Sequence, residues 1–268
     1  MKSGRCWTSS SGSLDEMNPG ASFLLRRFLR GFKGARREPA PVLTPSAAYD
    51  LWAATYDRQP DNLMFHLEAS LFSSLLAEIE LRGKVVLDIG CGTGRHWAEI
   101  LEQKPSALVG YDVASEMLER LREKYPQAQT RLLGGIDLEG AKGASADVLL
   151  STLTLAHIEP IEETLREWNR VLRPGGDVLL TDYHPAAFAA GADRTFRHRG
   201  ELNLIQNFPH PLVELQRLFR TLGWQELEFL ECRIDQSVRH FYEAQQALHV
   251  FERFYGVPIV FGWRLRKA

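Results

Sequence analysis

Three glycines at alternate positions, Gly90, Gly92 and Gly94, directly follow the apolar run Val85–Ile89. Glycine is favoured where φ is positive, or where a ligand must approach the backbone without meeting a Cβ atom. A helix that begins after such a turn adds free N–H groups and the positive end of its dipole. A dinucleotide-binding turn reads Gly-x-Gly-x-x-Gly, and here Arg95 stands where that pattern needs its last glycine. The residues around the turn must therefore decide which ligand it binds.

A carboxylate, Asp112, ends the next apolar run (106–111), 18 residues after Gly94. At this position a carboxylate can accept hydrogen bonds from both hydroxyls of a ribose. It could instead cap the helix predicted at 114–124, but its pairing with the glycine turn favours the ribose role. Met117 on that helix is either a core residue or a soft apolar wall for an adenine.

Strands and helices alternate along the chain from residue 46 onward. The predicted strands are 84–89, 106–111, 129–134, 146–151, 177–183, 224–233 and 257–265; the predicted helices are 63–81, 95–103, 114–124, 160–172, 212–222 and 239–255. Short, nearly continuous apolar strands separated by helices are typical of a parallel sheet that is covered on both faces. The pattern predicts a doubly wound α/β fold, with no internal repeat and no second hydrophobic core.

Five segments, in this order, resemble the class I S-adenosylmethionine-dependent methyltransferases, in particular the group that acts on small molecules. They are Tyr49–Asp57, Asp88–Gly94, Gly110–Leu118, Ala146–Ser151 with Leu155–Ile158, and Leu172–Leu180. The resemblance covers about residues 46–183, is specific for fold and cofactor, and does not specify the acceptor. It implies a seven-stranded, mostly parallel, Rossmann-like sheet whose last strand is antiparallel, within one domain at 46–268.

The resemblance also implies S-adenosylmethionine as the cofactor. The glycine turn would hold its methionine part and Asp112 its ribose, while Asp88 would orient the turn near the cofactor's amino group. Tyr49 and Tyr56 would cover the methyl end. The full set of expected cofactor-binding residues is Tyr49, Tyr56, Asp88, Gly90, Cys91, Gly92, Gly94, Arg95, Asp112, Val113, Met117, Gly135, Ile136, Asp137, Ser151 and Leu153.

The sequence departs from the family pattern after the third strand. There the family usually has Gly-Asp followed by Ala or Val, and the Asp accepts a hydrogen bond from the adenine N6 amine. In this chain Gly135 takes the Asp position, followed by Ile136 and Asp137. Either Asp137 replaces it through a shifted loop, or the adenine is held by the backbone N–H of Ile136 and by apolar contacts.

Two histidines are candidates for a general base. Methyl transfer from a sulfonium depends mainly on positioning, so a base is needed only when the acceptor must lose a proton. His157 and His184 follow the fourth and fifth strands, and an unperturbed histidine titrates near pH ~6.5. Each could instead be structural, His157 as a cap before a helix and His184 as a turn residue before Pro185. His184 is preferred because the irregular segment 184–210 is predicted to form, with residues 46–81, the lid over the acceptor.

We therefore predict an enzyme that methylates a small molecule, on oxygen or carbon. The alternatives are a non-catalytic S-adenosylmethionine-binding partner or regulatory subunit, and a nicotinamide-dependent oxidoreductase, which Arg95 disfavours. The net charge of -2 and a pI near 6.5 argue against a nucleic-acid partner. Cys6, Cys91 and Cys232 form no CxxC pair, so neither disulfides nor a metal site are expected. We expect a cytoplasmic monomer or homodimer.

The first 45 residues are predicted to form a flexible arm with a charge unlike that of the rest. Residues 1–40 carry a net charge of +5, and the apolar and basic residues of 22–37 alternate at helical spacing. This segment could be an interfacial helix that contacts anionic lipid or a partner. It could equally pack on its own domain or fold only in part.

Overall fold

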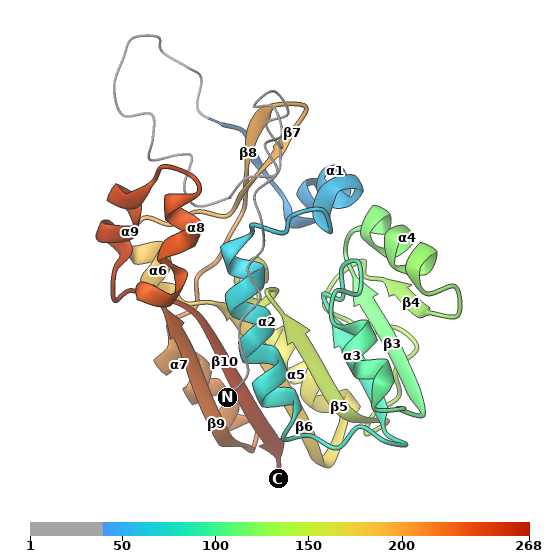
Figure 1. The fold of residues 1–268 in the computed structure, drawn as a ribbon. Coiled ribbons are helices and arrows are strands. Elements are labelled where there is room, and N and C mark those ends of the chain that lie inside the picture. The colour runs from blue at the N-terminus through green and yellow to red at the C-terminus, as the bar shows by residue number, and fades with distance from the viewer. Residues whose placement is uncertain (1–39) are drawn as a thin grey trace, which may run out of the picture.

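The computed structural model describes residues 40–268, which are built around a seven-stranded sheet in the order β4-β3-β2-β5-β6-β10-β9 (Figure 1). The strands are β2 (Val85–Ile89), β3 (Ala107–Asp112), β4 (Gln129–Leu132), β5 (Ala146–Thr152), β6 (Leu172–Tyr183), β9 (Trp224–Arg233) and β10 (Pro258–Lys267). The pairs from β4 to β6 are parallel, whereas β10 pairs antiparallel with both β6 and β9. The predicted fold class and the antiparallel last strand are therefore confirmed.

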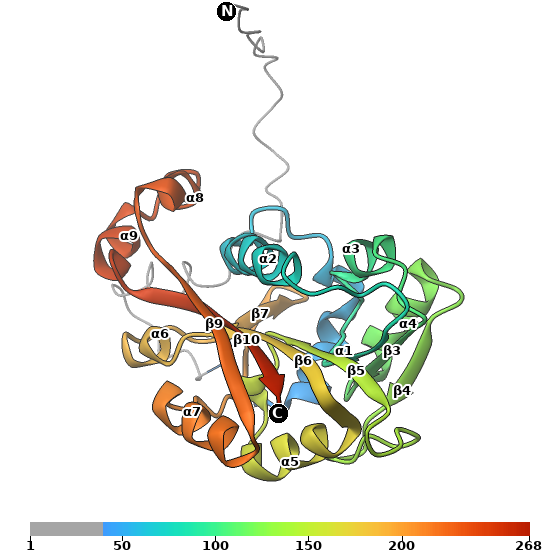
Figure 2. The same cartoon turned by 90° about the horizontal axis from the view of Figure 1, so that it is seen from below.

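Helices cover both faces of this sheet, as Figure 2 shows. One face carries α2 (Leu63–Leu76), α3 (Trp97–Glu102) and α4 (Ser115–Lys124); the other carries α5 (Ile161–Val171) and α7 (Leu212–Thr221). Both faces of the central strands are thus buried, which explains why these strands read as almost continuous apolar runs.

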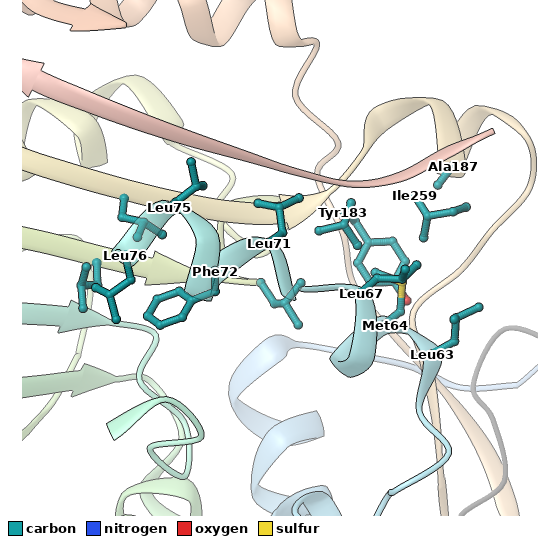
Figure 3. Close-up of a cluster of buried hydrophobic side chains, with 14 of the residues drawn as sticks. Leu63, Met64, Leu67, Leu71, Phe72, Leu75, Leu76, Tyr183, Ala187 and Ile259 are labelled. Atoms are coloured by element: carbon teal, nitrogen blue, oxygen red, sulfur yellow. The ribbon is translucent and has the colours of Figure 1, made fainter. Parts of the chain in front are cut away.

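Helix α2 packs directly on the sheet through Leu71, Phe72 and Leu75, which are all at most 3% exposed (Figure 3). The close approach depends on Gly262 in β10, where a Cβ atom would lie 2.2 Å from Leu71 Cδ2 and 2.7 Å from Leu75 Cδ1. A glycine in mid-strand marks such a close approach. It fixes α2 against β10 and positions the chain that leads into the glycine turn.

A small second sheet was not predicted. It joins β1 (Val42–Leu43), β8 (Glu201–Ile205) and β7 (Thr195–His198), in that order. It packs on α1 (Pro45–Tyr56) through Trp52 and Phe196, whose rings stack with centroids 5.2 Å apart. In Figure 1, α1 and the β7–β8 hairpin lie together beyond one end of the large sheet. The expectation that the chain has no second core was wrong, because Trp52 and Phe196 belong to a separate small cluster. The sequence did not reveal this cluster, because β8 pairs with a strand some 160 residues earlier and the short strands show no long periodicity.

The helix expected at 239–255 is also interrupted. It consists of α8 (Arg239–Glu243) and α9 (Leu248–Phe254). Gln246 has φ +54°, and the Ala247 N–H donates to the Tyr242 carbonyl at 2.9 Å, as in a Schellman-type helix end. Glycine usually takes such a left-handed position, so a glutamine there gives no sequence signal for the break.

The predicted basic arm at 22–37 lies outside the described residues. Within residues 40–268 no helix combines the length and apolar character needed to cross a membrane.

Candidate active site

A cavity of about 410 Å³ lies between the large sheet, α1 and the segment that follows β8. It is lined by Pro45, Tyr49, Tyr56, Ile89, Gly90, Gly92, Asp112, Val113, Met117, Leu133, Gly135, Ile136, Leu138, Thr152, Leu153, Thr154, His157, Ile158, Glu159, Pro160, Thr164, Trp168, Gln206 and Phe208. Most of this lining is apolar, with a few convergent polar groups, as is usual for small-molecule sites. The cavity brings together the glycine turn, Asp112, Tyr49, Tyr56 and His157.

The glycine turn has the backbone conformation that its sequence predicts. Gly90, Gly92 and Gly94 all have positive φ values, of 75°, 51° and 72°. A Cβ atom on Gly90 would lie 2.0 Å from Thr154 Oγ1, whereas a Cβ on Gly92 would meet no atom within 4 Å. Gly90 is therefore needed for packing against the β5 end. Gly92 leaves open space beside the cavity, as a turn that lets a ligand approach its backbone should.

Asp112 holds the turn in place. Its Oδ2 accepts a hydrogen bond from the Gly92 N–H at 2.7 Å, and its Oδ1 accepts one from the Ala114 N–H at 2.9 Å. Burial raises the pKa of Asp112 to about 6, although these backbone donors oppose the shift. Two carboxylate oxygens offer about four acceptor positions, so Asp112 retains capacity for further donors. Asp112 bonds the N–H of Ala114, which precedes α4, and not an N–H within the helix, so it does not form the helix cap considered above; it does line the cavity.

Helix α1 is attached to the turn and to α4 by its two aspartates. The Glu116 N–H donates to Asp50 Oδ1 at 2.9 Å, and the Thr93 hydroxyl donates to Asp57 Oδ1 at 2.6 Å. Lys124 donates to the other oxygen of Asp57 at 2.9 Å. These contacts keep the tyrosines of α1 over the cavity.

Several predicted cofactor residues lie beneath the cavity lining. Asp88 is buried and accepts a hydrogen bond from Trp97 Nε1 at 2.8 Å; burial raises its pKa to about 7. The hydroxyl of Ser151 donates to the Ile89 carbonyl at 2.9 Å. The Cys91 side chain packs against Gly110, where a Cβ would lie 2.7 Å from its sulfur. These residues, like Gly94, do not line the cavity, and they support the turn from within the protein.

Arg95 also lies outside the cavity. Its guanidinium pairs with the fully buried Glu68 and stacks over the Phe65 ring, 4.7 Å from the centroid. Glu68 also accepts from His96 at 3.0 Å and from the Thr181 hydroxyl at 2.7 Å. Burial alone would raise the pKa of Glu68, but Arg95 and His96 lower it to about 2. This buried ion cluster ties α2 to the helix that follows the turn.

After β4, Gly135 and Ile136 line the cavity, while Asp137 is exposed and does not. The Asp137 carboxylate therefore does not take the place of the acidic residue that the family has here. Leu133 and Leu138 supply apolar lining on either side of the loop.

His157 lies at the cavity wall with both ring nitrogens engaged. Its Nδ1 is 3.0 Å from the Gln206 carbonyl oxygen, so Nδ1 carries the proton that it donates. Its Nε2 is 2.7 Å from Arg194 Nη1 and 3.0 Å from the Tyr49 hydroxyl. Burial, together with the charge of Arg194, lowers the pKa of His157 well below its ordinary value. The ring is neutral, and its lone pair already accepts from Arg194.

Arg194 joins the small sheet to the large one. It is 3% exposed, and it donates through Nη2 to the Leu153 carbonyl at 2.8 Å. Nη1 lies 3.6 Å from Asp182 Oδ1 at the end of β6. Leu153 has φ +54°, a conformation that is costly for a bulky side chain such as leucine and that this contact helps to hold. The arginine therefore orients both His157 and the loop after β5.

His184, the preferred candidate base, lies away from the cavity. Its Nδ1 accepts from the Ala186 N–H at 3.0 Å, which caps the short helix α6 (Pro185–Ala189), and its Nε2 is 3.5 Å from Glu231. It is thus the turn residue before Pro185 that the alternative reading described.

Sequence reasoning gave no role to Gln206, Phe208, Thr164 or Arg194, although it expected the segment 184–210 to cover the acceptor. Gln206 and Phe208 reach the cavity because β8 pairs with β1 and the Phe208 N–H donates to the Ala156 carbonyl at 2.7 Å. No motif spacing predicts such long-range contacts. Within residues 40–268, no three His, Cys, Asp or Glu side chains are grouped so as to hold a metal ion.

Residues 87–180 match the family described as the methyltransferase domain. A probable S-adenosylmethionine-dependent methyltransferase of Mycolicibacterium smegmatis is 28% identical over 145 residues, which is 53% of this chain and 52% of the relative. A malonyl-[acyl-carrier protein] O-methyltransferase of Yersinia pestis is 37% identical over 102 residues, 37% of this chain and 36% of the relative. The chain thus spans about half or less of the length of these two relatives.

Among solved structures, magnesium protoporphyrin IX methyltransferase from Synechocystis PCC 6803, with bound S-adenosylmethionine, superimposes with a TM-score of 0.55. The match covers 83% of this chain and 92% of that chain at 14% identity, and it concerns the fold. Fold, glycine turn and family match together define the class: the chain contains a class I S-adenosylmethionine-dependent methyltransferase domain.

Proposed function

We propose that this protein transfers a methyl group from S-adenosylmethionine to an oxygen atom of a small-molecule acceptor, and that this oxygen is ionised before the reaction. The observation that carries the proposal is the cavity, whose lining includes both the glycine turn with Asp112 and the group formed by Tyr49, His157 and Phe208. A cofactor and an acceptor can therefore occupy one enclosed space.

The lining suits the cofactor. Gly92 offers backbone that a ligand can approach, Asp112 has acceptor capacity left for ribose hydroxyls, and Met117 with Ile136 provides apolar walls. The rings of Tyr49 and Tyr56 line the same space, and aromatic faces attract cations. S-adenosylmethionine supplies a methyl group that is already activated as a sulfonium.

The chain's own contribution is positioning and exclusion of water. Tyr49, Trp52 and Tyr56 contact one another ring to ring beside the cavity, and Trp52 stacks on Phe196 of the small sheet. Holding two reactants in a reactive geometry can supply about 7–11 kcal/mol of a barrier. This contribution is large enough for an in-line displacement without a covalent enzyme intermediate.

The acceptor preference follows from His157 and Arg194. The lone pair of His157 is engaged by Arg194, and its lowered pKa makes it a weak base. An acceptor whose oxygen is already negatively charged, such as a carboxylate or an acidic phenol, needs no base. The O-methyltransferase from Yersinia pestis is named for a malonyl acceptor, which carries a carboxylate.

The test is a turnover assay that measures S-adenosylhomocysteine release across carboxylic acids, carboxylated acyl thioesters, phenols and amines. Carboxylates or acidic phenols are expected to be methylated and amines are not. Methylation of amines alone would contradict the acceptor class. Cofactor binding by calorimetry with no turnover on any acceptor would instead favour the non-catalytic partner or regulatory subunit.

A further inference from the structure

A buried threonine on α5 lines the same cavity as Gly135, which stands where the family has its acidic residue. Thr164 is 4% exposed and lines the cavity, yet its Oγ1 finds no hydrogen-bond partner within residues 40–268. Its own N–H is satisfied by the Pro160 carbonyl at 3.0 Å. A buried polar group without a partner costs free energy, so the bare protein gains nothing from a hydroxyl at this position.

The loop after β4 is fixed against the same turn of α5. The Leu138 N–H donates to Glu167 Oε1 at 2.9 Å, and Leu138 packs in the same buried cluster as Trp168. Thr164 and Trp168 are four residues apart, on one face of the helix, and both line the cavity. Gly135 and Thr164 line the same cavity, and the hydrogen bond from Leu138 to Glu167 joins the loop of the first to the helix of the second.

Gly135 leaves that space open. It carries no side chain, and a Cβ built on it would meet no atom within 4 Å. The neighbouring lining, from Ile136, Leu138 and Ile158, is apolar. A nucleobase that enters here would contact apolar side chains but would need a polar partner for its exocyclic amine.

We propose that Thr164 supplies this partner: its hydroxyl binds the amine edge of the cofactor's adenine, in place of the acidic side chain absent at position 135. The inference rests on the proposed function, because it assumes that the adenine of S-adenosylmethionine occupies this part of the cavity. A threonine in a helix can adopt two χ1 rotamers, and rotation about the Cα–Cβ bond exchanges the positions of its hydroxyl and methyl groups. A hydroxyl can accept from an amine, so no charged group is needed.

The experiment compares Thr164→Val and Thr164→Ser with the wild-type protein, using calorimetric binding of S-adenosylhomocysteine and thermal unfolding without ligand. Thr164→Val is expected to weaken binding about 3- to 10-fold, the loss of one hydrogen bond, while the ligand-free protein unfolds at the same or a higher temperature. Thr164→Ser should retain the wild-type affinity. Thr221→Val on α7, whose hydroxyl donates to the Arg217 carbonyl, is the matched control and should leave affinity unchanged.

A second measurement does not depend on a folded variant. An analogue of S-adenosylhomocysteine that lacks the exocyclic amine should bind the wild type about 3- to 10-fold more weakly, and Thr164→Val should bind this analogue and S-adenosylhomocysteine almost equally. Equal affinity of wild type and Thr164→Val for S-adenosylhomocysteine would overturn the role of Thr164 alone. A wild-type protein that binds no S-adenosylhomocysteine would overturn the proposed function, and this inference with it.

Discussion

The glycine turn and the segment that follows the small sheet line the same cavity, but they are positioned by different kinds of contact. The turn from Gly90 to Gly94 follows a local glycine pattern, and Asp112, 20 residues after Gly92, accepts a hydrogen bond from it; a more distant hydrogen bond joins Thr93 to Asp57. Beside the small sheet, Arg194 contacts two residues of the cavity wall, Leu153 and His157, which lie 41 and 37 residues away. The side proposed for the cofactor is thus signalled by a local glycine pattern, whereas the side proposed for the acceptor is signalled by no local pattern.

This difference predicts which substitutions act on the cofactor side and which act on the fold around the acceptor. Arg194 should give the largest effect, because it crosses between the two sheets. Arg194→Met leaves the carboxylate of Asp182 buried without its cation, and breaking a buried pair in this way typically costs about 3–5 kcal/mol. Urea unfolding should show this loss in the free energy of unfolding.

Two further variants sharpen this prediction. Arg194→Lys keeps the charge and should lose less, and adding Asp182→Asn to Arg194→Met should restore part of the stability because it removes the unpaired carboxylate. Affinity for S-adenosylhomocysteine should change less than turnover in Arg194→Lys. If Arg194→Met unfolds within 1 kcal/mol of wild type, the arginine does not join the two sheets energetically.

The glycine turn should respond next most strongly. Gly90→Ala places a Cβ 2.0 Å from Thr154 Oγ1 at a residue with φ +75°. The left-handed backbone costs about 1–2 kcal/mol, and displacement of Thr154 adds to it, so we expect a loss of about 2–3 kcal/mol with at least tenfold weaker S-adenosylhomocysteine binding in calorimetry.

Gly83→Ala is the matched control for that change. Gly83 has a similar φ of +71°, but a Cβ there meets no atom within 4 Å, and the residue does not line the cavity. The free energy of unfolding of Gly83→Ala should fall only by the cost of the left-handed backbone, about 1–2 kcal/mol, and its affinity for S-adenosylhomocysteine should not change. Equal weakening of binding in both variants would mean that the turn acts through stability alone.

Asp88 should make the protein less stable as the pH rises. Its pKa is raised from 3.8 to about 7 in the folded protein, so between these values the folded state binds more protons than the unfolded state. Stability therefore falls as the pH rises from about 4 to 7, by about 2–4 kcal/mol. Asp112, with its pKa raised to about 6, contributes with the same sign.

Asp88→Asn tests this pH dependence, because an asparagine oxygen can still accept from Trp97. The variant should be more stable than wild type at pH 8, by about 2 kcal/mol, and its free energy of unfolding should vary less between pH 5 and 8. Denaturant titrations at several pH values check this. Superimposable pH profiles for the two proteins would show that Asp88 ionises normally in the fold.

The smallest effect is expected at His157. With its lone pair engaged by Arg194, replacement by glutamine should lower kcat less than about tenfold and leave the pH dependence of kcat between pH 6 and 9 unchanged. A general base contributes about 10²–10⁴-fold. A loss of that size in the glutamine variant, together with the disappearance of the acidic limb of the pH–rate profile, would show that His157 is the base. Tyr49→Phe is the control, because it removes only the hydrogen bond between Tyr49 and His157.

The same contrast explains what the sequence could predict. Strand positions, the antiparallel β10 and the conformation of the glycine turn follow from local patterns that packing reinforces. The small sheet and the break at Gln246 do not, because short strands and a non-glycine left-handed residue carry little signal. His184 looked suitable because it follows a strand end, but its side chain points to a helix cap and Glu231.

The predicted cofactor-binding residues divide into those that line the cavity and those with a structural role. The motifs predict residues that line the cavity, such as Gly92, Asp112 and Met117, because each lies at a strand end or near a helix start at the same edge of the large sheet. Arg95 sits in the motif, but a buried partner from α2, Glu68, engages it. No local pattern shows a partner 27 residues earlier, so the sequence alone cannot tell a ligand-binding arginine from a structural one.

The most direct test of the central claim is a crystal structure of the protein with S-adenosylhomocysteine. We predict density in the cavity between the glycine turn and Tyr49, with the ribose hydroxyls bonded to Asp112. Density for the ligand elsewhere on the protein, or a ribose without contact to Asp112, would contradict the account.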